Sequence, residues 1–146
     1  MDTGRRSGLF LHVTSLPGPE GIGTLGAGAR DFLEFAERAS ASVWQVCPLG
    51  PTVGVHGHSP YSPLSAFAGN PLLVDLDRLV GAGWLDASEI EPRPEVGPHR
   101  VDFDHVIEYK LPRLRAAFEG FEERAGAGER AAFESFRERE GDWLRD

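Results

Sequence analysis

The chain has 146 residues, 40% of them hydrophobic, which is the length of one ordinary domain with enough apolar content for a core. Its formal net charge is −8 and only one of its 15 basic residues is a lysine, so we expect no nucleic-acid partner, which would require clustered positive charge. No stretch approaches the ~18 uncharged apolar residues of a membrane span, and we expect a soluble, cytoplasmic protein without a membrane partner.

The first 50 residues predict a strand, a helix and a second strand. Leu9 to Val13 is a short apolar run that ends at turn residues. From Ala29 onward, apolar residues recur at helical spacing, with charged residues on the opposite face. Val43 to Cys47 is a second apolar run, which Pro48 stops. This order predicts a βαβ unit with a parallel sheet and a right-handed crossover, so the fold class is α/β.

Cys47 is the only cysteine, so an internal disulfide is excluded, which fits a reducing compartment. Its neighbours in WQVCPLG are apolar. We therefore expect a buried, inert thiol and not a nucleophile.

Between the two strands, Gly21 to Gly26 reads GIGTLG and matches the dinucleotide-binding pattern G-x-G-x-x-G. Two features count against binding of NAD by Gly21, Gly23 and Gly26. The insertion of Pro17 to Glu20 lengthens the connection, and no acidic residue ends the second strand. We prefer a glycine-rich loop that shapes the rim of a pocket, and we expect no cofactor.

His56 and His58 place two imidazoles in the next loop. A metal site needs three or four ligands, and no cysteine or glutamate accompanies this pair. We expect solvated histidines and no metal.

The stretch from His58 to Pro71, HSPYSPLSAFAGNP, is too rich in proline for a helix and too aromatic for an idle linker. A tyrosine held by prolines offers a flat apolar face with a polar tip, which suits stacking on a sugar ring. The alternative is that Tyr61 packs beneath its own loop. Asn70 is interpreted as a turn residue that fixes the loop.

The rest of the chain is predicted to be mainly helical. Leu72 to Leu76 is expected to be a short strand or extended segment, and Asp77 to Gly83 a brief helix. A proline-rich break covers Pro92 to Pro98. Helical spacing resumes at Val106, with breaks at Gly120 and at residues 125–128, and Glu129 to Trp143 forms a last, charged helix.

Two pairs of aspartates precede these helical patterns, Asp75 with Asp77 and Asp102 with Asp104. Such pairs could suggest acid/base chemistry. Aspartate is more often a helix cap, and we assign both pairs to capping.

Three separated blocks resemble one known family: GLFLHVTSLPGPEGIGTLG, WQVCPLGPT and SPYSPLSAFAGNPLLVDLDRL. In this order and spacing they are similar to the start of the 4-α-glucanotransferases of glycoside hydrolase family 77. The later VDFDHVIEYKLPRLRAAFEGF and DWLRD look like the subsequent helices of that family. The resemblance implies a (β/α)8 barrel of roughly 500 residues that moves α-1,4-glucan segments by a retaining mechanism, without a metal or an organic cofactor.

The resemblance also implies which parts are here. Residues 1–50 match the first βαβ unit of the barrel, residues 51–105 an inserted subdomain beside the glucan cleft, and residues 106–146 a helical continuation. The catalytic carboxylates of the family lie beyond the matched region, so the resemblance implies no catalytic residue in this chain. Eight strands need at least ~200 residues, and the missing C-terminal part of the same enzyme is the expected partner.

The resemblance places Tyr61 at the cleft beside the scissile sugar, with Ser59 next to it. Barrel geometry places His12, at the end of the first strand, towards the active face, and a structural role for this residue stays open as the alternative. These three residues are the expected contacts with α-1,4-glucans and maltooligosaccharides. His56, His58 and Ser62 depart from the tyrosine, aspartate and glutamine that are common in the family, which puts a secondary glucan site in doubt.

Two rival functions remain open. The first is an inactive remnant that binds glucans, and the second is a dinucleotide-binding βαβ domain. Whichever function holds, we expect the 146-residue chain alone to be inactive in glucan transfer. We also expect it to associate through exposed apolar helix faces.

Overall fold

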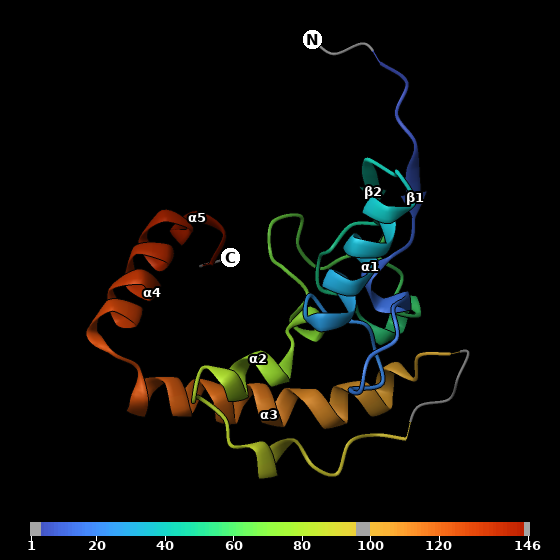
Figure 1. The fold of residues 1–146 in the computed structure, drawn as a ribbon. Coiled ribbons are helices and arrows are strands. Elements are labelled where there is room, and N and C mark those ends of the chain that lie inside the picture. The colour runs from blue at the N-terminus through green and yellow to red at the C-terminus, as the bar shows by residue number, and fades with distance from the viewer. Residues whose placement is uncertain (1–3, 96–99, 145–146) are drawn as a thin grey trace.

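The computed structural model describes residues 4–95 and 100–144 and begins with a strand–helix–strand unit. Strand β1 (Gly8–Phe10) pairs in parallel with β2 (Val43–Gln45), with Leu9 opposite Trp44, and helix α1 (Ala27–Arg38) lies between them in sequence. Figure 1 shows α1 beside this strand pair. The predicted parallel α/β unit is thus confirmed, with shorter strands than the sequence indicated.

Helix α1 forms because its apolar residues fall on one side. Ala29 and Ala36 are buried, and the ring of Phe32 lies 4.8 Å from the ring of Trp44 on β2. The indole Nε1 of Trp44 donates to the carbonyl of Leu11 at 2.7 Å. These contacts fix the helix against the strand pair.

The prediction that the first strand runs to Val13 was wrong. After Leu11, whose N–H still donates to Gln45 O, the chain turns into a 3₁₀ segment at Val13–Ser15. The turn buries Val13 at 1% exposure, since its side chain finds apolar contact by leaving the line of the strand. A long connection then leads to α1.

A short strand or extended segment was predicted over Leu72 to Leu76, and only Val74 and Asp75 are extended. Pro71–Leu73 is a 3₁₀ segment, and helix α2 (Leu76–Gly81) begins directly after Asp75. Both starts are capped, because Asn70 accepts from the N–H of Leu72 and Asp75 from the N–H of Arg78. The cap predicted at Asp75 is confirmed, but Asp77, which was assigned to capping with it, lies inside α2 and accepts from Arg93. Asn70, predicted as a turn residue, caps the 3₁₀ segment.

Helix α3 (Phe103–Arg124) is the longest element, and Asp102 caps it by accepting from the N–H of His105 at 3.1 Å. The predicted break at Gly120 was wrong. A Cβ on Gly120 would lie 2.0 Å from the carbonyl oxygen of Trp84, so the glycine allows close approach within a continuous helix. A 3₁₀ segment at Ala87–Ile90 lies between α2 and α3 in sequence.

Helix α3 contributes to two apolar clusters. The first cluster joins α2, the Ala87–Ile90 segment and α3, and its buried members are Leu76, Leu85, Ile90, Tyr109 and Ala117. The second cluster joins the glycine-rich loop to the start of α3, and its buried members are Ile22, Leu72 and Val106. The hydroxyl of Tyr109 donates to Ile90 O at 2.5 Å, which satisfies its polar end inside the first cluster. Segments far apart in sequence therefore meet on α3 (Figure 1).

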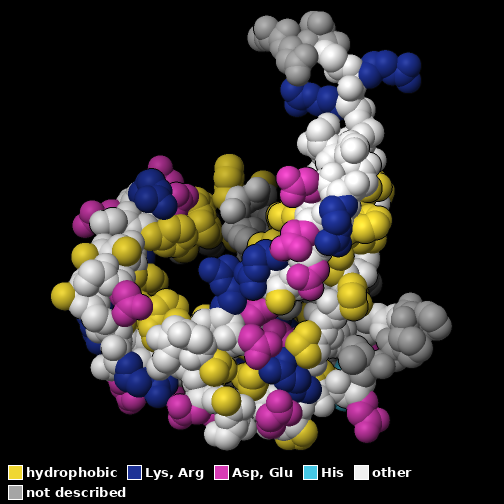
Figure 2. Space-filling view, in the orientation of Figure 1, with side chains coloured by type: hydrophobic (Ala, Val, Ile, Leu, Met, Phe, Trp, Pro, Cys, Tyr) yellow, Lys and Arg dark blue, Asp and Glu magenta, His cyan; other side chains and the backbone are white. Residues whose placement is uncertain are grey.

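Helices α4 (Ala127–Arg139) and α5 (Gly141–Leu144) form an arm beyond α3. Hydrophobic side chains gather along the inner edge of this arm, towards an open gap (Figure 2). Phe118, Phe136 and Leu144 are 46%, 39% and 44% exposed. These exposed apolar groups are the basis of the predicted self-association, which stays a prediction.

None of the helices in the described ranges is long and apolar enough to cross a membrane.

Candidate functional site

The clearest candidate site is the loop that leaves β2, residues 46–70. Two backbone hydrogen bonds close it, from Leu64 N to Pro51 O and from Asn70 N to Leu49 O, each within 2.9 Å. At its tip, the N–H groups of His56 and His58 both donate to Val53 O. The loop therefore satisfies much of its backbone by itself, and it holds one shape without entering the core.

Tyr61 lies on the outer surface of this loop with 70% of its area exposed. The alternative that the ring packs beneath its own loop is not what the structure shows. Two other apolar side chains of the loop, Leu64 and Phe67, are also exposed, at 72% and 76%. An exposed aromatic face with a polar tip is suited to stacking against an apolar, hydroxyl-bearing ligand.

Ser59 stands next to this tyrosine, as the sequence indicated. Its Oγ accepts a hydrogen bond from the backbone N–H of Tyr61 at 3.3 Å. The hydroxyl thus serves as a turn acceptor, and its remaining lone pair and proton are available to a ligand.

The hydroxyl of Tyr61 contacts Cys47, two residues beyond the end of β2. The distance from Sγ to Oη is 3.5 Å. The contact raises the pKa of Tyr61 above its ordinary value of 10.0, chiefly through the hydrogen bond to Cys47 and then through the charge of the thiolate. Cys47 is half-buried, so the expectation of a thiol enclosed in apolar surroundings was wrong.

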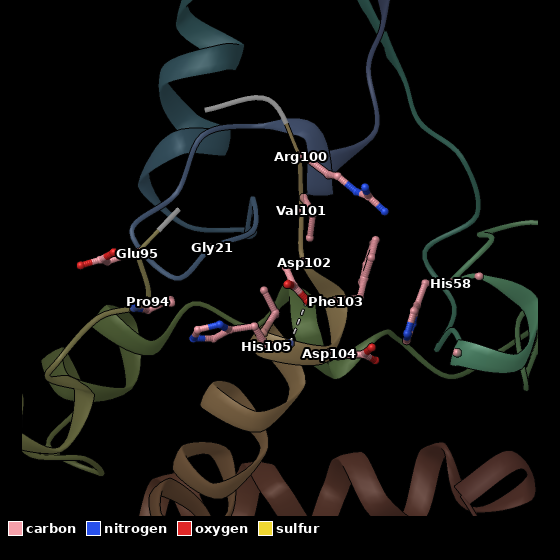
Figure 3. A pocket seen from close by; sticks show the side chains of 13 residues that line it. Gly21, His58, Pro94, Glu95, Arg100, Val101, Asp102, Phe103, Asp104 and His105 are labelled. Atoms are coloured by element: carbon pink, nitrogen blue, oxygen red, sulfur yellow. Dashed lines mark hydrogen bonds between the residues drawn. The ribbon is translucent and has the colours of Figure 1, made fainter. Parts of the chain in front are cut away.

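His58 contacts the start of α3. Its ring stacks on Phe103 with centroids 4.6 Å apart and planes 8° from parallel, and its Nδ1 lies 3.3 Å from Thr52 Oγ1. The prediction of a solvated His58 was wrong, because the stack covers one face of the ring, whereas His56 is exposed as predicted. The rings of His58 and Phe103 lie at a pocket (Figure 3), which Asp102, Asp104 and Arg100 also line. Its volume is about 680 Å³.

His12 lies at the end of β1, directly before the 3₁₀ turn. The side chain is half-buried, and its Nδ1 is enclosed without a hydrogen-bond partner. Burial lowers the pKa of His12 below 6.5, because the charged imidazolium is poorly solvated there. Among the described residues, hydrogen bonds join Ser59 to Tyr61, and none joins His12 to either of them.

A buried ion pair lies behind the loop. Lys110 of α3 and Glu20 of the glycine-rich loop are 0% and 1% exposed, and they bond directly to each other. Lys110 also donates to Val74 O at 2.6 Å, and Glu20 accepts from the N–H of Leu76 at 2.9 Å. The pair therefore joins three segments at the point where the candidate loop returns to the core.

Three carboxylates, of Glu20, Asp75 and Asp77, lie within 4.8 Å of one another. Each of them already accepts from a protein donor: Glu20 from Lys110, Asp75 from Thr24 Oγ1, and Asp77 from Arg93. The guanidinium of Arg93 lowers the pKa of Asp77 below its usual range. The cluster is thus explained by internal bonding.

The glycine-rich stretch has a structural explanation. A Cβ on Gly23 would lie 2.0 Å from Val13 O, and one on Gly26 would lie 1.4 Å from Asp75 Oδ2. These glycines make room for the protein's own atoms, so they leave none for a pyrophosphate at the same positions. Gly21, with φ +80°, lines the pocket of Figure 3, in agreement with the predicted pocket rim.

Sequence reasoning missed two contacts at the loop, between Cys47 and Tyr61 and between His58 and Phe103. The position of Cys47 at the carboxyl end of a parallel strand was the signal available for the first, since loops that leave this end gather there. No signal in the sequence pairs His58 with a residue 45 positions later.

A family model described as 4-alpha-glucanotransferase matches residues 11–146. The chain is 49% identical over 146 residues to a 4-alpha-glucanotransferase of Thermus thermophilus, covering 100% of this chain and 28% of that protein. It is 44% identical over 117 residues to a chloroplastic/amyloplastic 4-alpha-glucanotransferase of Solanum tuberosum, covering 77% of this chain and 20% of that protein.

Among solved structures, an amylomaltase from Streptococcus agalactiae in complex with acarbose matches with a TM-score of 0.85 and 34% identity. The match covers 94% of this chain and 27% of that chain. The chain thus spans between a fifth and little more than a quarter of the length of these proteins.

Proposed function

The chain belongs to the 4-alpha-glucanotransferase family, and from this premise we propose that it forms part of an enzyme that transfers α-1,4-glucan segments between maltooligosaccharides. The observation that supports the assignment of a glucan surface is the exposed ring of Tyr61, whose hydroxyl contacts the end of a parallel strand. This ring gives the chain an apolar platform for a sugar face.

We place β1 and β2 as the first two strands of a (β/α)8 barrel, with residues 1–50 as its first βαβ unit. The parallel pairing of β1 with β2 across α1 supports this placement. Residues 51–105 form an inserted subdomain beside the cleft, and residues 106–146 continue it as helices. Since ligands of such barrels bind at the carboxyl ends of the strands, both loops that leave β1 and β2 belong to the active face.

The reaction follows the retaining scheme. A carboxylate attacks the anomeric carbon while a carboxylic acid protonates the departing 4-oxygen, and the 4-hydroxyl of a second glucan then displaces the carboxylate and returns the proton. We assign both carboxylates to the remainder of the enzyme, which is the partner of this chain. Within the chain, Tyr61, Ser59 and His12 hold and orient the glucan, so this part contributes binding and not bond cleavage.

A cytoplasmic location completes the proposal. The only cysteine is half-buried and no disulfide can form within the chain, which is compatible with a reducing compartment.

The test is a chimera in which this chain replaces the 146 aligned residues of the Thermus thermophilus relative. Incubation with maltotriose is expected to yield glucose and longer glucans. Tyr61→Ala should raise KM for maltotriose at least tenfold, because the stacking face is lost. The matched control is Phe67→Ala, which removes an equally exposed ring of the same loop and is expected to leave KM unchanged.

Failure of the unmutated chimera to transfer, with retained binding of maltooligosaccharides, would support the rival function of an inactive glucan-binding remnant. Equal effects of Tyr61→Ala and Phe67→Ala would contradict the assignment of Tyr61 as the sugar platform. The 146-residue chain alone is expected to release no glucose from maltotriose.

A further inference from the structure

The thiol of Cys47 lies where it can control the orientation of Tyr61. Cys47 follows β2 by two residues and precedes a proline, which restricts its backbone conformation. Tyr61 comes 14 residues later, on a loop that is bonded mainly to itself. Their contact of 3.5 Å therefore joins the first residues of the loop, next to the strand pair, to the ring on its outer surface.

Little else orients this ring. Tyr61 is 70% exposed, so packing restrains its side-chain torsions weakly. Its backbone N–H is fixed by Ser59 Oγ, but that bond leaves the side chain free to rotate. Among the described residues, Cys47 is the one hydrogen-bond partner of the Tyr61 hydroxyl.

We propose that Cys47 is a positioning residue, whose thiol holds the hydroxyl of Tyr61 and thereby fixes the direction in which the ring that receives a sugar extends from the loop. The inference rests on the proposed glucan function for its consequence, but the contact itself is independent of that function. A side chain whose direction is set before the ligand arrives loses less rotational freedom on binding, which favours affinity.

The contact can be tested on the 146-residue chain by ultraviolet titration of the phenolate. The chain has two tyrosines, so subtracting the titration of Tyr61→Phe from that of the unmutated chain isolates Tyr61. Cys47→Ala is expected to lower the pKa of Tyr61 towards 10, because the hydrogen bond and the thiolate charge are both removed. Cys47→Ser keeps a partner without the charge, and it should give an intermediate pKa.

The positioning role can be tested by kinetics in the chimera. Cys47→Ala should raise KM for maltotriose about threefold while kcat changes less than about twofold, since one hydrogen bond outside the bond-breaking groups is lost. Cys47→Ser should have a KM close to that of the unmutated chimera. The double variant Cys47→Ala/Tyr61→Phe should be no worse than Tyr61→Phe, because both single changes break the same contact.

An unchanged pKa of Tyr61 in Cys47→Ala would overturn the proposal, whatever the kinetics show. A lowered pKa with an unchanged KM in an active chimera would overturn the positioning role and leave only the contact. An unmutated chimera that neither transfers nor binds glucans would instead overturn the proposed function, and the positioning role with it, while the titration would still report the thiol–phenol contact.

Discussion

Two long loops leave the carboxyl ends of the two parallel strands, and they take opposite courses. The loop after β1, residues 11–26, turns inward, with Glu20 and Ile22 each 1% exposed. The loop after β2, residues 46–70, stays on the surface and exposes Tyr61 at 70%. Both are rich in glycine and proline, so composition alone does not separate them.

The two loops differ in how closely their backbones can pack against the rest of the protein. Gly23 and Gly26 let the first loop lie against Val13 and Asp75 at distances that no side chain allows. The second loop carries bulky apolar rings between prolines and bonds to itself, from Leu64 N to Pro51 O. An inward loop stabilises the fold, whereas an outward loop that keeps one shape can receive a ligand.

The strongest test of this comparison is Lys110→Met, which removes the partner of Glu20 in the inward loop. A buried carboxylate is left unpaired, and the free energy of unfolding should fall by about 3–5 kcal/mol. Urea denaturation followed by tryptophan fluorescence measures the change.

The double variant Glu20→Gln/Lys110→Met serves as the control for this first prediction. It has no unpaired charge and keeps an oxygen for the N–H of Leu76, so it should recover most of the loss. A loss below 1 kcal/mol in Lys110→Met would contradict the burial of the pair, which joins the inward loop to α3.

A second test contrasts glycines of the two loops. Gly23→Ala should destabilise the fold by about 1–3 kcal/mol, because its Cβ would lie 2.0 Å from Val13 O. Gly69→Ala in the outward loop meets nothing within 4 Å and should change stability by less than about 0.5 kcal/mol. Thermal unfolding of both variants measures the difference, and equal effects would remove the distinction between the loops.

A third test concerns the aromatic contact of the outward loop with α3. A double-mutant cycle of His58→Ala and Phe103→Leu should give a coupling energy of about 0.5–1.5 kcal/mol, since the rings stack at 4.6 Å. Replacement of the exposed His56 by alanine should show no coupling to Phe103. A coupling energy of zero between His58 and Phe103 would contradict the stacking contact between the outward loop and α3.

The smallest effect is expected from pH. The folded pKa of His12 lies below the unfolded value of 6.5, so the unfolded chain protonates first as the pH falls. The free energy of unfolding is therefore not reduced by His12 above pH 6.5, and it decreases as the pH falls from 6.5 through the lower folded pKa of His12. His12→Gln should weaken the loss of stability between pH 7 and pH 5, measured by urea denaturation, and an unchanged pH dependence in this variant would contradict the prediction.

The sequence was sufficient for the elements with strong local signals. The helical spacing of α1, the caps at Asp75 and Asp102 and the strand–helix–strand order are confirmed, whereas Asp77 and Asp104, also assigned to capping, lie in the first turns of α2 and α3. The errors arose where a distant contact overrides a local preference. Gly120 reads as a helix break in isolation, but it lies within α3 because Trp84 approaches it there.

At the candidate site, the exposure of Tyr61 and its place beside Ser59 followed from the sequence. The contact with Cys47 did not, because an apolar neighbourhood in sequence suggested burial. The strand ends at Gln45, so Cys47 already lies beyond the paired residues and faces the returning loop. The ion pair of Glu20 with Lys110 joins residues 90 positions apart, and no local pattern predicts it.

That ion pair also has a chemical consequence. Lys110 is the only lysine of the chain, and its side chain is 0% exposed, so the folded protein presents no lysine amine to its surroundings. Reagents that acylate amines should modify Lys110 only after α3 has separated from the glycine-rich loop. The rate of acylation at this one position would therefore report how often the molecule opens there.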